Sequence, residues 1–202
     1  MARYTGARVK ISRRFGVPIF GESKYLERRN YPPGVHGPKS RRKVSEYGLG
    51  LIEKQKLRYY YGLQEKQFRN TYKAALKADG VTGETLLKLL ETRLDHVVYL
   101  CGYAQTKAAA RQLVNHGHIT VNDRKVDIPS FRVAPDQVIG VKVGPKSKQM
   151  ISKALEGSTS RVCPGWLIVD KDALRAKVIR LPAKEDMVSI ASEQAVVEFY
   201  SR

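Results

Sequence analysis

The chain has 202 residues, 42% of them apolar, which is enough for one or two domains with a buried core. It carries 37 Lys and Arg against 19 Asp and Glu, a net charge of +18, so we expect a polyanionic partner. The longest apolar runs, such as "VVYLC", are too short to span a bilayer, and the basic start "MARYTGARVK" lacks the apolar stretch of a secretory signal, which predicts a soluble, cytoplasmic protein.

The excess positive charge is concentrated in two parts of the chain. Residues 1–45 contain 12 basic and 2 acidic side chains, and residues 92–155 contain 10 and 4, whereas residues 156–202 balance at 7 and 7. Such clustering costs self-repulsion unless an anion neutralises it. Nucleic acid is the first expectation. A membrane surface is disfavoured because Pro and Gly interrupt the basic N-terminal run, which therefore cannot form a long amphipathic helix.

The first segment, residues 1–44, is expected to be a basic arm rather than a domain. The stretch "RRNYPPGVHGPKSRRK" places Pro and Gly among basic residues and has no sustained periodicity. A segment of this kind buries little by itself and becomes ordered against a partner.

The next segment, residues 45–91, has a helical pattern. Ser45 is a candidate N-cap for a helix that stops at Gly62, and a second helix follows and stops at Gly80. Thr82 caps a third, whose leucines recur at helical spacing. The run after this cap is compatible with one helix or with two that are separated by a break near Thr92.

A further amphipathic helix is expected between Thr106 as N-cap and Gly117 as stop. At 100° per residue, Arg111 and Asn115 lie within about 80° of Lys107, and alanine, leucine and valine lie opposite. The stretch contains no acidic residue. We expect these three polar residues to form an outward ridge above a thin apolar face.

Short strands are expected after this helix. "HITVNDRKVD" alternates apolar and polar residues and turns at Asn122-Asp123, which indicates a hairpin, although Gly is usual at the second position of such a turn. "RVAPDQVIGVKV", "WLIVD" and "AKVIRL" indicate more strands, and "GVKVGPKSK" is interpreted as a strand followed by a basic turn. The last segment, "SEQAVVEFYSR", is apolar enough to dock on the rest of the chain.

Catalytic and metal-binding patterns are weak. His116 and His118 form an HxH pair, but Gly117 is expected to end a helix between them and no third ligand is near in sequence, so we expect no metal. Cys101 and Cys163 lack a CxxC partner, and Cys101 is expected to be a small core residue without a disulfide. No nucleophile, base and oxyanion donor come together, so we expect a protein that is not an enzyme and has no cofactor.

With catalysis and metal binding disfavoured, binding of a ligand is the function that the sequence favours. Basic residues are interleaved with aromatic and amide residues in "KQKLRYYYGLQEKQFRNTYK". Cations neutralise phosphates, while Tyr, Gln, Asn and His reach 2′-hydroxyl groups or exposed bases. A folded RNA suits such a discontinuous basic surface. The candidate RNA-binding residues are Arg3, Arg8, Lys10, Arg13, Arg14, Lys39, Arg41, Arg42, Lys43, Lys54, Lys56, Arg58, Arg69, Tyr72, Arg93, Lys107, Arg111, Gln112, Asn115, His116 and Lys125.

Long stretches of the chain resemble a known family. Residues 93–133, "RLDHVVYLCGYAQTKAAARQLVNHGHITVNDRKVDIPSFRV", look like the RNA-binding α-L motif, two short helices on a small antiparallel sheet. "MARYTGARVKISRR", "TGETLLKLLETRLD" and "VVEFYSR" are similar to bacterial-type small (30S) ribosomal subunit protein number four, in a form without the zinc-binding cysteines of some relatives. The resemblance implies an α+β fold: a basic N-terminal arm (1–44), a mainly helical domain (45–91) completed by residues 182–202, and an inserted α-L domain (92–181).

The resemblance also implies a function. Members of the family are structural constituents of the small ribosomal subunit, bind 16S-type ribosomal RNA early in assembly, contact ribosomal protein number five at an interface linked to accuracy, and in some cases repress their own messenger. Lys39, Arg41, Arg42 and Lys43 match the region that meets messenger RNA where it enters the ribosome. An RNA-modifying enzyme or a stress-related RNA-binding protein with an appended α-L domain is the alternative. An enzyme would need a catalytic domain, and no segment of this chain is long enough to form one. A stress-related RNA-binding protein would not need the helical domain that this chain has.

Overall fold

The computed structural model describes residues 4–21, 23–38, 43–142, 144–157, 162–187 and 190–201. The chain forms two compact units: Met1–Thr85 together with Ser189–Arg202, and Leu86–Val188. Helices occur in both, and the second contains an antiparallel sheet, which confirms the expected α+β class. The domain borders that we expect at residues 45, 92 and 182 stay predictions. No helix in the described part of the chain is long and apolar enough to cross a membrane.

Two short helices lie in the segment that we expected to lack periodicity. They are α1 (Arg8–Phe15) and α2 (Lys24–Arg28). Gly16 ends α1 in the left-handed conformation, at φ 67°. The ring of Tyr4 meets that of Tyr59 edge-on, with centroids 5.3 Å apart. The start of the chain therefore packs on the helix that contains Tyr59.

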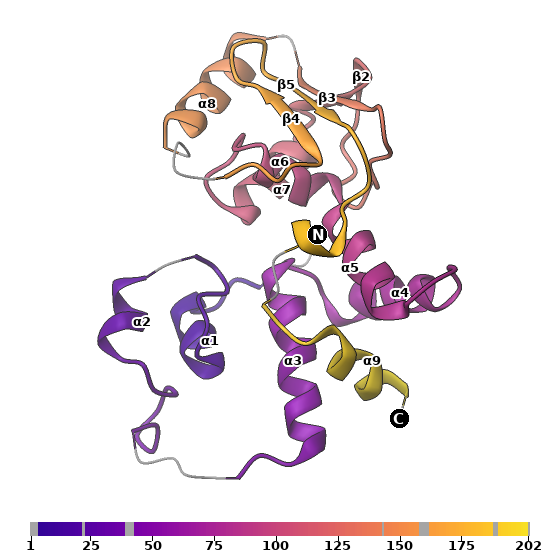
Figure 1. Cartoon of the computed structure of the whole chain (residues 1–202). Helices are drawn as coiled ribbons and strands as arrows, with labels where there is room; N and C mark the ends of the chain where they lie inside the picture. Colours follow the sequence, from indigo (N-terminus) through magenta and orange to yellow (C-terminus); the bar gives the residue numbers. More distant parts are fainter. Residues whose placement is uncertain are drawn as a thin grey trace. The chain divides into compact units, whose positions relative to one another are not determined.

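The first unit continues with α3 (Glu46–Tyr60) and α4 (Glu65–Leu76). The hydroxyl of Ser45 accepts a hydrogen bond from Gly48 N, which confirms the predicted cap, and Gly62 follows α3 with φ 65°. The last helix, α9 (Glu193–Ser201), lies beside α3 (Figure 1). Gly50 allows this approach, because a Cβ there would lie 3.2 Å from Cβ of Phe199.

The leucine-rich run is broken into two helices. They are α5 (Thr82–Glu91) and α6 (Leu94–Leu100), and Arg93 between them is extended, with φ −66° and ψ 134°. Arg93 forms an antiparallel bridge with Arg132. The amide of Leu94 donates to the Phe131 carbonyl at 2.8 Å, and the amide of Val133 donates to the Thr92 carbonyl at 2.9 Å. A single helix would forfeit these bonds.

The second unit is built on a sheet with strand order β2-β1-β3-β5-β4 and antiparallel pairing throughout. Its strands are β1 (Ile119–Val121), β2 (Arg124–Lys125), β3 (Val138–Val141), β4 (Leu167–Asp170) and β5 (Arg175–Val178). The core between the sheet and the helices includes Trp166, Ile139 and Val97, all fully buried. The antiparallel sheet therefore gives the neighbouring helices a rigid support.

The hairpin turns where the sequence indicates. Asn122 and Asp123 both have positive φ, 49° and 60°, as a two-residue turn of the type I′ class requires. The side chain of Asn122 accepts a hydrogen bond from Val138 N at 2.8 Å, which ties the turn to β3. Asp therefore takes the second position without changing the hairpin.

The interpretation of residues 145–148 as part of a basic turn is wrong, because they begin α8 (Pro145–Glu156). Pro145 stands at the first position of the helix, where its missing N–H costs nothing. Ile151 is fully buried and holds α8 on the core of the second unit. A short 3₁₀ turn, η1 (Lys184–Asp186), follows β5.

Candidate nucleic-acid interface

Helix α7 (Lys107–Asn115) has the cap and the apolar face that its sequence predicts. The hydroxyl of Thr106 accepts a hydrogen bond from Ala109 N at 3.2 Å. Ala110, Leu113 and Val114 are buried in the core, and Gly117 ends this segment with φ 68°. The helix is fixed at its start and along one face, so its polar residues project from a rigid support.

The prediction that Lys107, Arg111 and Asn115 form an outward ridge is wrong for Arg111, the middle residue. Arg111 is only 8% exposed, and its guanidinium donates to the Asp95 carboxylate at 3.2 Å. Asp95 also accepts two hydrogen bonds from Arg93, at 3.0 and 3.1 Å. Burial lowers the pKa of the Arg111 guanidinium, and Asp95 acts in the opposite direction. A buried acid on α6 thus turns Arg111 inwards.

Lys107 is half-buried, and its ammonium group lies 5.4 Å from the centre of the Tyr99 ring. A cation over an aromatic face is attracted by the ring quadrupole. The exposed polar residues at the end of α7 are Gln112, Asn115 and His116. The outward surface of α7 is therefore made mainly of amide and imidazole groups.

Three more candidate residues, Lys54, Tyr72 and Arg93, are buried, with exposures of 5%, 4% and 5%. The Lys54 ammonium lies 2.7 Å from the Glu65 carboxylate and 5.1 Å from the centre of the Phe199 ring. These side chains hold elements of the chain together, and none of them faces solvent. The alternation of basic and aromatic residues in α3 and α4 is thus partly a packing pattern.

Glu65 is the acid at the centre of this packing. Burial by itself raises the pKa of its carboxyl, but hydrogen bonds from Lys54 and Tyr200 outweigh this and leave the pKa below the ordinary 4.5. Burial and the bond to Glu65 both raise the pKa of the Tyr200 hydroxyl. A deprotonated Glu65 beside a neutral Tyr200 is therefore the stable arrangement near neutral pH.

The basic residues of α1 are divided between packing and solvent. The guanidinium of Arg13 donates to the carbonyls of Arg29 and Tyr31, at 3.1 and 3.2 Å. Arg8, Lys10 and Arg14 are exposed. This short helix therefore presents three exposed cations.

Two half-buried cations of α3 have partners within the chain. Lys56 forms an ion pair with Glu53 at 2.6 Å. Arg58 donates to the side chain of Gln55 at 2.7 Å, and its guanidinium lies 4.4 Å from the centre of the Tyr59 ring. Partly neutralised cations of this kind bind phosphate more weakly than free ones.

Nine candidate residues are exposed and open to a ligand. They are Arg8, Lys10, Arg14, Lys43 and Arg69 in the first unit, and Gln112, Asn115, His116 and Lys125 in the second. Arg3, Lys39, Arg41 and Arg42 lie outside the described residues. Exposed Lys and Arg neutralise phosphates, and amides and imidazoles hydrogen-bond to base edges and 2′-hydroxyl groups. The exposed set is thus chemically suited to RNA.

Exposed cations on and before α8 are not among the residues that the sequence predicts to bind RNA, because it predicts a strand and a turn for residues 140–148 and no helix after them. They are Lys142, Lys148 and Lys153. The signal was present in the sequence: Ser147, Ile151 and Leu155 recur at every fourth position after Gly-Pro, as in an amphipathic helix.

The described histidine and cysteine residues do not form a metal site. Nδ1 of His118 lies 2.9 Å from the Ser147 hydroxyl. Groups of three or more His, Cys, Asp or Glu that could hold a metal are absent among the described residues. Cys101 and Cys163 are free thiols, and burial raises the pKa of both. As predicted, Cys101 is a core residue.

Comparison with known proteins agrees with the resemblance in the sequence. The family model "Ribosomal protein S4/S9 N-terminal domain" matches residues 3–91, and the model "S4 domain" matches residues 92–139. Proteins named small ribosomal subunit protein uS4 are 57% identical in Opitutus terrae, 52% in Akkermansia muciniphila and 50% in Halalkalibacterium halodurans, over the full length of each chain. The expectation of a structural rather than an enzymatic protein is confirmed by the same matches. The chain belongs to the family of small ribosomal subunit protein uS4.

Proposed function

We propose that the chain is a structural component of the small ribosomal subunit in the cytoplasm, and that it binds the 16S-type ribosomal RNA directly. Its relatives are named as small-subunit ribosomal proteins, and the S4 domain model covers residues 92–139. The net charge of +18 supports a phosphate-rich partner. Both compact units carry exposed cations, so both bind RNA.

The observation that carries this proposal is the polar surface of α7. Gln112, Asn115 and His116 are exposed on a helix that has no acidic residue and whose opposite face is buried. Amides and imidazoles on a rigid support recognise 2′-hydroxyl groups and base edges, while Lys125 on the neighbouring hairpin neutralises a phosphate. A helix kept only for solubility has no need of this acid-free surface.

Finer roles are part of the same proposal. The protein binds early and nucleates the body of the subunit, contacts ribosomal protein number five, contributes to translational accuracy and represses its own messenger. Exposed Lys43 contacts messenger RNA where it enters the ribosome, together with Lys39, Arg41 and Arg42, which lie outside the described residues. The basic arm (1–44), the helical domain (45–91 with 182–202) and the α-L domain (92–181) are the parts that perform these roles.

The test is binding of the full chain to 16S ribosomal RNA transcribed from the same organism. Filter binding at constant salt should show a strong preference for this RNA over a transcript of the same length and base composition in scrambled order. Equal affinity for the two transcripts would overturn specific recognition.

A second measurement uses the protein in the cell. After sedimentation in a sucrose gradient, the chain should travel with small subunits and stay with them after a moderate salt wash. Recovery only in the free protein fraction would favour the alternative of a free-standing RNA-binding protein.

A further inference from the structure

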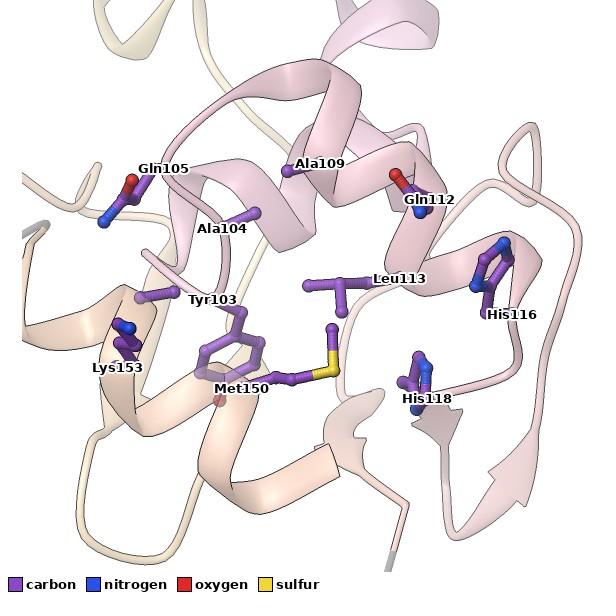
Figure 2. A pocket seen from close by; sticks show the side chains of 11 residues that line it. Tyr103, Ala104, Gln105, Ala109, Gln112, Leu113, His116, His118, Met150 and Lys153 are labelled. Carbon is purple, nitrogen blue, oxygen red and sulfur yellow. The ribbon is translucent and has the colours of Figure 1, made fainter. Parts of the chain in front are cut away.

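A cavity of about 320 Å³ opens between α7 and α8 in the second unit. Figure 2 shows side chains of both helices around it, together with His118, which precedes β1. Small-molecule sites in proteins have volumes of roughly 300–1,000 Å³, so this cavity is large enough for one flat heterocycle. It adjoins the exposed end of α7, because Gln112 and His116 belong to both.

The lining combines apolar surface with polar groups. Ala109, Leu113 and Met150 supply the apolar part. The polar part consists of two carboxamides, two imidazoles and one ammonium group, from Gln105, Gln112, His116, His118 and Lys153. Among the described residues, none that line this cavity is acidic. A cationic occupant therefore finds no carboxylate to pair with.

Two of the lining residues indicate a preformed site. The imidazole of His118 is held by the Ser147 hydroxyl, at 2.9 Å, and Ser147 is itself buried. Tyr103 is fully buried, and its hydroxyl has no hydrogen-bond partner among the described residues. A buried hydroxyl is costly to leave unpaired, so a bound group that reaches it gains a hydrogen bond.

We infer that this cavity receives one unstacked base of the RNA that the chain binds, an inference that rests on the proposed function. Sequence-specific recognition of RNA uses bases that leave the stack, lie against flat side chains such as His and form hydrogen bonds with side-chain amides. The imidazole of His118 supplies a fixed flat surface, and the carboxamide of Gln112 supplies a donor and an acceptor. Lys153 neutralises the phosphate beside that base.

The surroundings favour a base over a side chain of a partner protein. The cavity is continuous with the acid-free outward surface of α7, where phosphates and riboses of a bound strand are accommodated. Several cations lie on and near α8, with Lys148 and Lys153 both exposed. A protein partner with acidic residues is one other occupant, and the experiment below distinguishes it.

The experiment measures chemical reactivity of bases in 16S ribosomal RNA with and without the full chain. Dimethyl sulfate reports adenine and cytosine, and a carbodiimide reports guanine and uracil. The variants Ala109→Leu, which fills the cavity, and Gln112→Ala, which removes a carboxamide, are compared with Gln149→Ala, which removes an exposed carboxamide on α8 outside the lining. Thermal unfolding confirms that each variant is folded.

The expected result is one unpaired base that the unchanged protein protects and that becomes reactive in both cavity variants, but stays protected with Gln149→Ala. The cavity variants should lower affinity about tenfold, the scale of one base contact, while the dependence of log K on log salt stays the same because no phosphate contact is lost.

Retained protection with both cavity variants overturns the inference even when the RNA is bound specifically. Failure of the unchanged chain to prefer 16S RNA overturns the proposed function instead. Loss of binding to a ribosomal protein, with base reactivity unchanged, assigns the cavity to a protein partner.

Discussion

Asp95 lies between two guanidinium groups, from Arg93 and Arg111, and all three side chains are almost inaccessible to solvent. The carboxylate is the acceptor that allows two cations to be buried beside the core. Buried charges are tolerated when they are paired and hydrogen-bonded, and they become costly when one partner is removed. This cluster joins the segment between α5 and α6 to α7, so it positions the RNA-facing helix.

At this scale, Asp95→Ala should lower the free energy of unfolding by about 3–5 kcal/mol, because it removes the carboxylate that accepts hydrogen bonds from two buried guanidinium groups. Urea denaturation followed by circular dichroism measures the change. Lys125→Ala, at an exposed position, should stay within about 0.5 kcal/mol of the unchanged protein. Equal stability of the Asp95 variant would mean that the cluster is solvated in solution.

The inward orientation of Arg111 was not predictable from the sequence. On a helical wheel it lies beside Lys107, as a surface residue should, and its partner stands 16 residues earlier on another helix. A pairing of that kind depends on how α6 and α7 pack. By contrast, Leu113 and Val114 are buried as their apolar character predicts.

At the scale of the elements, α9 packs on the rest of the first unit through aromatic rings and one hydrogen-bonded network. The Tyr200 ring stacks on that of Tyr72 at 4.5 Å, and its hydroxyl donates to Glu65 at 2.9 Å. Glu65 also accepts from buried Lys54. The helix is therefore docked by a hydrogen bond to an ion-paired acid and by stacked rings, rather than by aliphatic packing alone.

Glu65→Gln should lower the free energy of unfolding by about 1–3 kcal/mol near neutral pH, because Lys54 loses its charged partner. The pKa of Glu65 is below 4.5 in the folded chain, so its contribution is present above pH 4.5 and is lost as the pH falls through the lower folded value. The difference between the variant and the unchanged protein should therefore shrink in acid. Urea titrations at several pH values measure it, and a difference that grows in acid would contradict the assignment.

The hairpin turn gives a second prediction for an element. Asn122→Ala should lower stability by about 1–3 kcal/mol, because alanine tolerates a positive φ poorly and the hydrogen bond to Val138 is lost. Asn122→Gly keeps the left-handed conformation and loses only the side-chain bond, so it should cost less. Thermal or urea unfolding ranks the two variants, and the reverse order would contradict the turn geometry.

Elements with local signals were predictable, and elements held by distant contacts were not. Ser45 and Thr106 are caps in the structure because a hydroxyl needs only the next turn to find its donor. The break at Arg93 depends on a bridge to Arg132, far along the chain, so the sequence left it open. Helix α1 is short and has few apolar residues, and it is stabilised by contacts with α3.

On the scale of the whole molecule, exposed cations are divided between two compact units in one chain. Linked binding surfaces increase each other's effective concentration when both reach the same RNA. Each phosphate contact also contributes separately to the salt dependence of binding.

Arg14→Gln in the first unit and Lys125→Gln in the second should each lower the slope of log K against log salt by about 0.7–0.9, as expected for one phosphate contact. The double variant should show the sum, because the two residues share no partner. Filter binding to 16S RNA across a salt series measures the slopes. Lys171→Gln, an exposed cation outside the candidate set, is the control and should leave the slope unchanged.

The docking of α9 on α3 also has a consequence in time. The first unit is formed by segments that precede and follow the second unit in the sequence. During synthesis, more than a hundred residues are therefore added between its early helices and α9. At translation rates of about 5–20 residues per second, that interval lasts roughly 5–20 s. During it the second unit is completed while Phe68 and Tyr72 still lack the ring of Tyr200. The nascent chain thus exposes an aromatic surface for a defined interval. During that interval a chaperone or the RNA itself can bind this surface before α9 does.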